Sequence, residues 1–363
     1  MSKLYDLNVI GLNSVNVESF PSVIHRLSYL HGVSVSTLID YCFDYYNKRH
    51  KVKINNNHVR KFSNINTLVR PNKTTKSLLE VVSYTLNCSR LKSTTFLALE
   101  DILDTSKETY SDHLRWCPIC FYEYEQLGLD GYYKLIWSLT SVESCFIHQV
   151  QLRDTCQYCE KHQAYFATRS PAVKCQSCKL SLGTSLEQIS VDESWSVCDE
   201  GFIDLVTEIA SFPELVYPKN GIQQLVRSIY QHALENKHEE KLKQLLSADY
   251  TLRLIYSEKP VSMITLRRLA YKLGVRLTHI LKGDTHYLQY SLNPYWNKIY
   301  TDNLTPKPKL KHDHQHIYNE LLKVLETGHK YSSLKSLCDE LNVSSGYLAY
   351  RYPELVEKIR CKG

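Results

Sequence analysis

The sequence predicts a mainly α-helical protein with one small domain organised around paired cysteines. Glycine and proline are scarce, at 12 and 11 of 363 residues, or about 3% each against averages of about 7% and 5%. This scarcity argues against a many-stranded sandwich, barrel or propeller. Apolar residues recur at helical spacing in several segments, and the chain contains 12 cysteines. With 43% apolar residues, we expect about two to three folded domains of roughly 150 residues each.

The charge composition permits many functions and establishes none. The chain carries 44 Lys and Arg against 38 Asp and Glu, which gives a net charge of +6 and an isoelectric point near 8.6. This mild basic bias permits a nucleic-acid partner. No run approaches the roughly 18 apolar residues of a transmembrane helix, and residues 1–20 contain no signal-peptide pattern. We therefore expect a cytoplasmic protein with no membrane partner, in which thiols stay reduced.

Residues 1–50 are expected to form a helix-turn-helix-like unit. Apolar or small residues at positions i, i+3 and i+4 mark one helical face, and a turn that contains glycine follows it. These positions are Ile24, Leu27, Ser28, Gly32, Val33 and Leu38. His31 departs from the pattern, because it stands in a slot that is apolar in the two C-terminal copies described below. Residues 51–110 are polar and are expected to form a helical connector.

Residues 111–185 contain four pairs of metal-ligand residues, and two residues separate the members of each pair. The eight residues are Cys117 and Cys120, Cys145 and His148, Cys156 and Cys159, and Cys175 and Cys178. This gap lets a tight turn direct two side chains at one Zn²⁺, with Zn–S distances of about 2.3 Å. Eight ligands make two closed tetrahedral sites, so we expect a double zinc-finger domain with two structural ions. Of the other cysteines, Cys42 and Cys338 are expected in the core.

The spacing leaves two ways to pair these ligands. Sequential pairing places the first two pairs on one ion and the last two pairs on the other. Cross-brace pairing places the first and third pairs on one ion, as in a RING domain, whose ligand order the chain matches. Seven residues separate His148 from Cys156, where we expect about two or three in a RING. We therefore favour the sequential pairing.

Residues 186–257 alternate apolar and charged positions at helical period and are expected to form a helical bridge. Two further helix-turn-helix units follow, at 258–300 and, after a basic linker, within 301–363. The apolar pattern of the first unit recurs in the second at an offset of 68 residues. The matching positions are Leu266, Leu269, Ala270, Leu273, Val275 and Ile280, and Leu334, Leu337, Cys338, Leu341, Val343 and Leu348. Gly274 and Asn342 in the turns tolerate left-handed conformation.

Both C-terminal units carry side chains that suit double-stranded DNA. Lys and Arg neutralise phosphates, and Arg and Thr can also read base edges. In the 258–300 unit the candidate DNA contacts are Arg267, Arg268, Lys272, Arg276, Thr278, His279 and Lys282. In the 301–363 unit they are Ser344, Ser345, Tyr347, Tyr350 and Arg351. The alternative for each unit is a helical hairpin that only packs a core.

The sequence lacks the motifs of common enzyme classes. It contains no Gly-rich Walker-type phosphate loop, no HExxH motif and no nucleophile elbow. Nothing in the sequence brings carboxylates together as an acid–base pair. We therefore expect no catalytic residues and no enzymatic activity.

The cysteine region resembles the TniQ/TnsD family of transposon target-site selectors. The family pattern has an aromatic residue before Cys-Pro-x-Cys and a Trp before Cys-x-x-His, here Trp116, Cys117–Cys120, Trp137 and Cys145–His148. A Leu four residues after the His leads into Cys-x-x-Cys, here Leu152 and Cys156–Cys159. The segments 18–34 and 352–355 are also similar to family sequences. Gln149 stands where glycine usually follows the His.

The resemblance implies a bacterial protein that marks an insertion site and recruits an AAA+ ATPase regulator (TnsC or TniB type), which brings the transposase. It implies no bond chemistry by the chain itself. The site is found by direct binding of double-stranded DNA, which we favour, or by docking on a CRISPR Cascade complex with its guide RNA. A homodimer is common among Cascade-bound relatives. Two other interpretations stay open: a zinc-dependent helix-turn-helix transcription regulator and a RING-type ubiquitin ligase.

Overall fold

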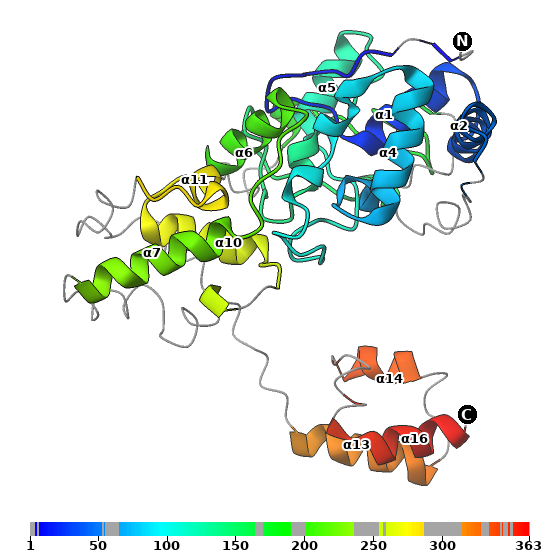
Figure 1. The fold of residues 1–363 in the computed structure, drawn as a ribbon. Helices are drawn as coiled ribbons and strands as arrows, with labels where there is room; N and C mark the ends of the chain where they lie inside the picture. Colours follow the sequence, from blue (N-terminus) through cyan, green and yellow to red (C-terminus); the bar gives the residue numbers. More distant parts are fainter. Residues whose placement is uncertain are drawn as a thin grey trace. The chain divides into compact units, whose positions relative to one another are not determined.

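The computed structural model forms two compact units, residues 1–297 and 298–363 (Figure 1). The described residues are 4–5, 7–52, 54, 65–163, 170–189, 200–235, 254–256, 259–286, 314–327, 334–341, 343, 348 and 351–362. The basic linker that was predicted at the start of the 301–363 unit lies outside the described residues.

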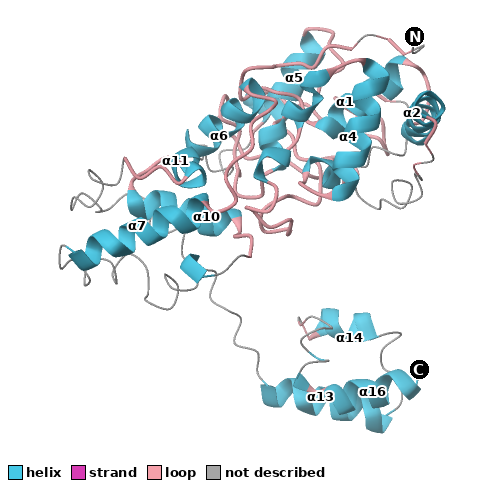
Figure 2. Ribbon diagram, in the orientation of Figure 1, coloured by secondary structure: helices cyan, strands magenta, loops and turns pink. Residues whose placement is uncertain are grey.

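Helices supply the regular structure of the described residues, which contain no strand (Figure 2). The mainly α-helical fold class is therefore confirmed. The α-helices of the first unit are α1 (Phe20–Leu30), α2 (Val35–His50), α4 (Lys73–Leu86), α5 (Pro118–Gln126), α6 (Glu200–Ser211), α7 (Gly221–Glu235), α10 (Met263–Leu273) and α11 (Leu277–Lys282). Its 3₁₀ helices are η1 (Ile65–Val69), η2 (Ser89–Thr94), η3 (Leu97–Leu99), η4 (Leu135–Ser138) and η5 (Leu186–Gln188). Among the described residues, no helix has both the length and the apolar character needed to cross a bilayer.

One continuous core runs through the first unit, from Leu7 to Leu281. Trp116 and Trp137, which flank the first ligand pairs, are among its largest fully buried side chains. The cysteine region is thus built into the core and does not stand apart as an appended finger. Segments that the sequence divided at residues 50, 110, 185 and 257 therefore share a single core in their described parts.

The first two helices form a helical hairpin at the N-terminal end of this unit. Ser34 caps α2, because its Oγ accepts a hydrogen bond from the Thr37 N–H at 3.1 Å. His31 lies in the turn between the helices, where its Nε2 accepts a hydrogen bond from the Tyr5 N–H at 3.0 Å and its ring stacks on that of Tyr5. This position at the surface explains why residue 31 does not need to be apolar in this copy of the pattern.

The same backbone hydrogen bond closes the turn in all three copies of the helix-turn-helix pattern. The bonds run from the N–H of a valine to an earlier carbonyl: Val33 to Ser28 at 3.1 Å, Val275 to Ala270 at 3.1 Å, and Val343 to Cys338 at 3.0 Å. This 6→1 bond is typical of the Schellman motif, which needs a left-handed residue. Gly32 and Gly274 supply it, with φ of 61° and 60°. The internal repeat of the sequence is thus also a repeat of backbone structure.

The second unit has a small core of its own. It contains α13 (His314–Thr327), α14 (Leu334–Glu340) and α16 (Pro353–Lys362). Its buried residues are Ile317, Leu321, Leu337, Cys338, Val343, Leu348 and Val356. Cys338 is buried here and Cys42 is buried in the first unit, as the sequence predicts for both.

Candidate metal centres

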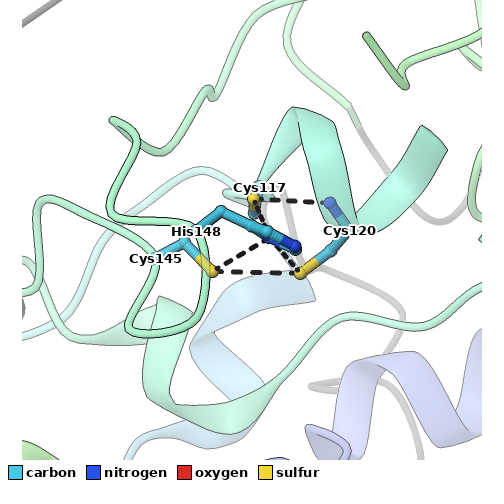
Figure 3. Close-up of side chains that lie close together, drawn as sticks. All are labelled: Cys117, Cys120, Cys145 and His148. Atoms are coloured by element: carbon cyan, nitrogen blue, oxygen red, sulfur yellow. Dashed lines mark hydrogen bonds between the residues drawn. The ribbon is translucent and has the colours of Figure 1, made fainter. Parts of the chain in front are cut away.

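The structure gathers the eight predicted ligands into two groups of four. The groups are Cys117, Cys120, Cys145 and His148, and Cys156, Cys159, Cys175 and Cys178. Within each group the ligand atoms all lie within 4.8 Å of one another. Figure 3 shows the first group, in which the imidazole of His148 lies among the cysteine sulfurs. This is the sequential pairing, and the cross-brace pairing of a RING domain is therefore wrong for this chain.

The distances in the first group match a tetrahedral zinc site. Zn–S bonds of about 2.3 Å and Zn–N bonds of about 2.0 Å give sulfur–sulfur edges of about 3.8 Å and sulfur–nitrogen edges of about 3.5 Å. Nδ1 of His148 lies 3.4 Å from Sγ of Cys117 and 3.4 Å from Sγ of Cys120. It lies 3.8 Å from Sγ of Cys145, which is itself 3.8 Å from Sγ of Cys120.

The second group has the edges expected of four sulfurs around one ion. The Sγ atoms of Cys156 and Cys178 are 3.7 Å apart, and those of Cys159 and Cys175 are 3.6 Å apart. Both values are close to the tetrahedral edge of about 3.8 Å. The residues of both groups therefore fit a zinc ion in donor type and in spacing.

Three of the four ligand pairs lie in hairpins of the same build. In each hairpin the backbone N–H of the first ligand donates to the carbonyl two residues after the second ligand. The backbone carbonyl of the first ligand accepts a hydrogen bond from the N–H of the residue directly after the second ligand. That last residue has left-handed backbone conformation in every case. The residues are Gln149 with φ of 55°, Glu160 with φ of 56° and Lys179 with φ of 65°. The repeated turn directs both side chains of a pair into the same group of four.

The remaining pair begins helix α5. Cys117 is the N-cap, and its Sγ accepts a hydrogen bond from the Cys120 N–H at 3.4 Å. Pro118 stands in the first turn, where its missing N–H costs no helical hydrogen bond. The helix dipole favours negative charge at this end, so the helix stabilises the Cys117 sulfur as a thiolate.

The next turn of α5 orients the histidine ligand. Oε1 of Glu123 lies 3.1 Å from Nε2 of His148, so the carboxylate can accept a hydrogen bond from the imidazole. This bond leaves Nδ1 as the free lone pair and turns it toward the sulfurs. The arrangement is the carboxylate–histidine pair that commonly supports a metal-bound imidazole.

Helix α5 also holds the second group in place. Its Glu125 accepts hydrogen bonds from Lys174 and Ser181, which flank the Cys175–Cys178 hairpin. The chain after this hairpin runs close against the helix, since a Cβ atom on Gly183 would lie only 2.5 Å from the backbone nitrogen of Tyr122. The two groups are thus supported by different residues of one short helix.

Lys134 places a buried positive charge beside the first group. The residue is 2% exposed, and its Nζ lies 3.7 Å from Sγ of Cys120. The rings of Trp137 and Phe146 lie 5.3 Å and 5.1 Å from the same ammonium. A divalent ion with three thiolates and a neutral imidazole carries one net negative charge. With such an ion bound, the ammonium of Lys134 would offset that charge, and the charged site would in turn make a buried lysine tolerable.

Burial disfavours the thiolate of one cysteine in each group, Cys117 and Cys156, when no cation balances the charge. It raises the pKa of the Cys117 thiol well above its usual range and raises the pKa of the Cys156 thiol to about 12. A divalent cation displaces such protons and stabilises the thiolates in its place. Because each group already supplies four ligands, neither leaves a position for a catalytic water. The geometry therefore suits structural metal sites.

Residues 9–152 match the TniQ family model. The chain carries a TniQ domain. The match covers α1 through η4 and all four ligands of the first metal group, and the second group follows it along the chain. TniQ is a family associated with transposition, so the resemblance found in the sequence is confirmed. No curated protein matches the chain.

The predicted DNA contacts of the 258–300 unit lie on and between α10 and α11, and several of them reach helix α6. Nη1 of Arg276 lies 3.3 Å from Oδ2 of Asp204, and Nζ of Lys282 lies 2.5 Å from Oε1 of Glu208. The guanidinium of Arg267 lies 5.6 Å from the centroid of the Phe202 ring. Arg276 and Lys282, which were expected to contact phosphates, thus form ion pairs with carboxylates of the same unit.

The other predicted contacts of this unit differ in exposure. Thr278 is only 5% exposed, because α11 is a short helix in contact with α6, α7 and α10, and its role at base edges stays a prediction. Arg268 and His279 are half-buried. The side chain of Lys272 lies outside the described residues.

Arg351 is the predicted DNA contact of the second unit that the structure describes, and it is exposed. The others lie outside the described residues: Ser344, Ser345, Tyr347 and Tyr350.

Sequence reasoning missed Glu123 and Lys134 at the metal centre. Glu123 had a signal, since it stands one helical turn after Cys120. No sequence signal pointed to Lys134, because only the tertiary fold brings its side chain to Cys120.

Proposed function

We propose that the protein selects target sites for DNA transposition. It binds double-stranded DNA at the insertion site and recruits an AAA+ ATPase regulator of the TnsC or TniB type, which brings the transposase. The observation that carries this proposal is the TniQ match over residues 9–152. The chain acts by binding, and the bond chemistry belongs to the transposase.

We propose Zn²⁺ as the ion of both metal centres, in a structural role. Three thiolates with an imidazole, and four thiolates, are the ligand sets that zinc takes in closed tetrahedral sites. When bound, the ions hold hairpins that have no strands or helices of their own to fix them. Cys117, Cys120, Cys145 and His148 hold one ion, and Cys156, Cys159, Cys175 and Cys178 hold the other.

Targeted insertion tests the proposed function directly. A transposition assay with the regulator and transposase should give insertions at one preferred site when this chain is present. Omission of the chain should abolish that preference, and the purified chain should retain the regulator on an affinity column. Insertions that keep the same site preference without the chain would refute the proposal. Selection that requires Cascade would replace direct DNA reading by the docking route.

Arg276 tests whether the 258–300 unit reads DNA directly. Arg276→Ala should weaken binding to a duplex that spans the insertion site by about 1–3 kcal/mol, measured against a scrambled duplex. Its ion-pair partner supplies the matched control, because Asp204→Ala also breaks the contact between α11 and α6. If Arg276 meets DNA, Asp204→Ala should leave binding unchanged or strengthen it. Equal losses in both variants would assign Arg276 to helix packing.

A further inference from the structure

Helices α2 and α4, which are in contact, present a set of aromatic and basic side chains. Figure 1 shows α2 at the edge of the first unit. We call this set the ring surface and define it as Tyr41, Tyr45, His50, Tyr84, Lys48 and Arg49. All but Tyr84 lie on α2, and Tyr84 comes from α4. Neither metal centre uses any of these residues.

The rings of this surface form a connected series. Tyr41 and Tyr45 stack with centroids 6.2 Å apart and an interplanar angle of 20°. Tyr84 lies 6.2 Å from Tyr45 and 4.5 Å from His50 by the same measure. Tyr46 packs against this series. The centroid of its ring lies 4.3 Å from that of His50 in a stacked arrangement, and its hydroxyl donates a hydrogen bond to Glu80 Oε1 at 2.5 Å.

The exposure of these rings exceeds what helix packing needs. Tyr46 is 8% exposed and already joins α2 to α4, as do apolar residues of both helices. Tyr84 is nevertheless 42% exposed, His50 is exposed, and Tyr41 and Tyr45 are half-buried. Rings that served the core alone would be covered, so these faces are available to another molecule.

Positive charge stands directly beside the rings. Lys48 and Arg49 are exposed and lie in the last turn of α2, where they also complement the helix dipole. The Arg49 guanidinium carbon lies 5.6 Å from the centroid of the Tyr45 ring. Its charge is therefore held against a stacking face, as in protein grooves that bind phosphates and bases together.

We propose that the ring surface binds single-stranded DNA. Aromatic faces stack on unpaired bases and the neighbouring cations neutralise the backbone, which together are the two features of single-strand binding sites. A duplex would leave the rings without a partner, because its base faces are already stacked. An acidic peptide would account for the cations and not for the rings. The choice of DNA over RNA rests on the proposed function in transposition.

Binding to a fluorescent oligomer of about 20 deoxythymidines, with the full-length chain, tests this inference. Wild type should bind the oligomer more tightly than the matching oligouridine. Tyr84→Leu removes the π face and keeps an apolar side chain, so it should weaken binding about 10-fold. Tyr84→Phe should restore the affinity. Lys48→Gln should reduce the dependence of binding on salt.

Tyr256→Ala is the matched control, because Tyr256 is an exposed tyrosine outside this surface, and it should leave the affinity unchanged. Unaltered thermal unfolding of Tyr84→Leu would show that the variant folds. The inference is overturned if the oligomer does not bind, if Tyr84→Leu binds like wild type, or if oligouridine binds more tightly. Failure here with intact targeted insertion would leave the proposed function standing. Loss of targeted insertion with intact single-strand binding would refute the proposed function and leave the ring surface as a single-strand binding site.

Discussion

Gln149 ends the first ligand hairpin in a conformation that glycine adopts more easily. Its φ of 55° lies in the left-handed region, where a Cβ atom costs about 1–2 kcal/mol. We expect Gln149→Gly to raise the free energy of unfolding of the metal-loaded protein by about 0.5–1 kcal/mol, measured by urea denaturation. Gln151→Gly serves as the control, because residue 151 has no left-handed strain, and it should destabilise. A gain in both variants would contradict the argument from strain.

Lys134 makes a separate prediction about metal affinity. Removal of its charge with Lys134→Met should weaken metal binding at the first group about 10-fold, because the site then keeps an uncompensated negative charge. Competition with a chromophoric chelator measures this, and the second group should retain its affinity. Lys73→Met, on the exposed face of α4, should change neither group. Unchanged affinity in Lys134→Met would show that the ammonium does not neutralise the site.

His25 on α1 should make stability depend on pH. Burial lowers the pKa of His25 to about 4, against about 6.5 in an unfolded chain. The unfolded state therefore binds the proton more readily, so this contribution to stability is present above pH 6.5 and is lost as pH falls toward 4. Between pH 7 and 5 the loss should be about 2 kcal/mol. His25→Gln should show a smaller loss than wild type in urea unfolding at the two pH values, and equal losses would exclude His25 as the cause.

At the scale of elements, the contact between α7 and α11 depends on glycine. A Cβ atom on Gly221, the first residue of α7, would lie 2.1 Å from the Leu281 carbonyl oxygen. Gly221→Ala should therefore force the helices apart and cost about 1–3 kcal/mol of unfolding free energy. Gly274→Ala separates the steric clash from backbone strain. Gly274 has a left-handed φ of 60° and no neighbour within 4 Å, so an added Cβ atom meets no other residue. The substitution should cost only the backbone strain, about 1 kcal/mol.

The same packing shows what the helical pattern alone could not predict about α11. Its sequence alternates cations with apolar residues, which is typical of a helix with one exposed face. In the fold this short helix is in contact with α6, α7 and α10, so Thr278 is buried and Lys282 meets Glu208. No feature within 258–300 could reveal carboxylates that come from 200–211. Local amphipathicity predicts that a helix packs, and it does not predict on how many sides.

At the scale of the whole molecule, the metals should stabilise only the first unit. Both ligand groups lie in the core of residues 1–297, whereas the described residues of 298–363 contain no such group. A strong chelator should therefore unfold the first unit and leave the helices of the second, so the helical circular-dichroism signal should fall only in part. Metal analysis should find two zinc ions per chain before chelation. The Cys88→Ser variant, whose substitution lies outside both groups, should bind the same amount of zinc as wild type. Complete loss of helix, or none, would contradict this division.

The sequence by itself determined the features that depend on near neighbours. Two-residue gaps singled out the eight residues that the structure gathers into two groups, and the apolar spacing located three turns closed by the same hydrogen bond. Both follow from local backbone geometry, which a few adjacent residues set. The scarcity of glycine and proline indicated the helical fold class for the same reason.

Only the tertiary structure decided which distant residues meet. It placed Cys145 and His148 with Cys117 and Cys120, brought Lys134 to the first group and joined segments predicted as separate domains in one core. It also covered Thr278 and left the rings of α2 and α4 open. These outcomes depend on packing between segments that are far apart in the chain, and packing energy belongs to no single segment.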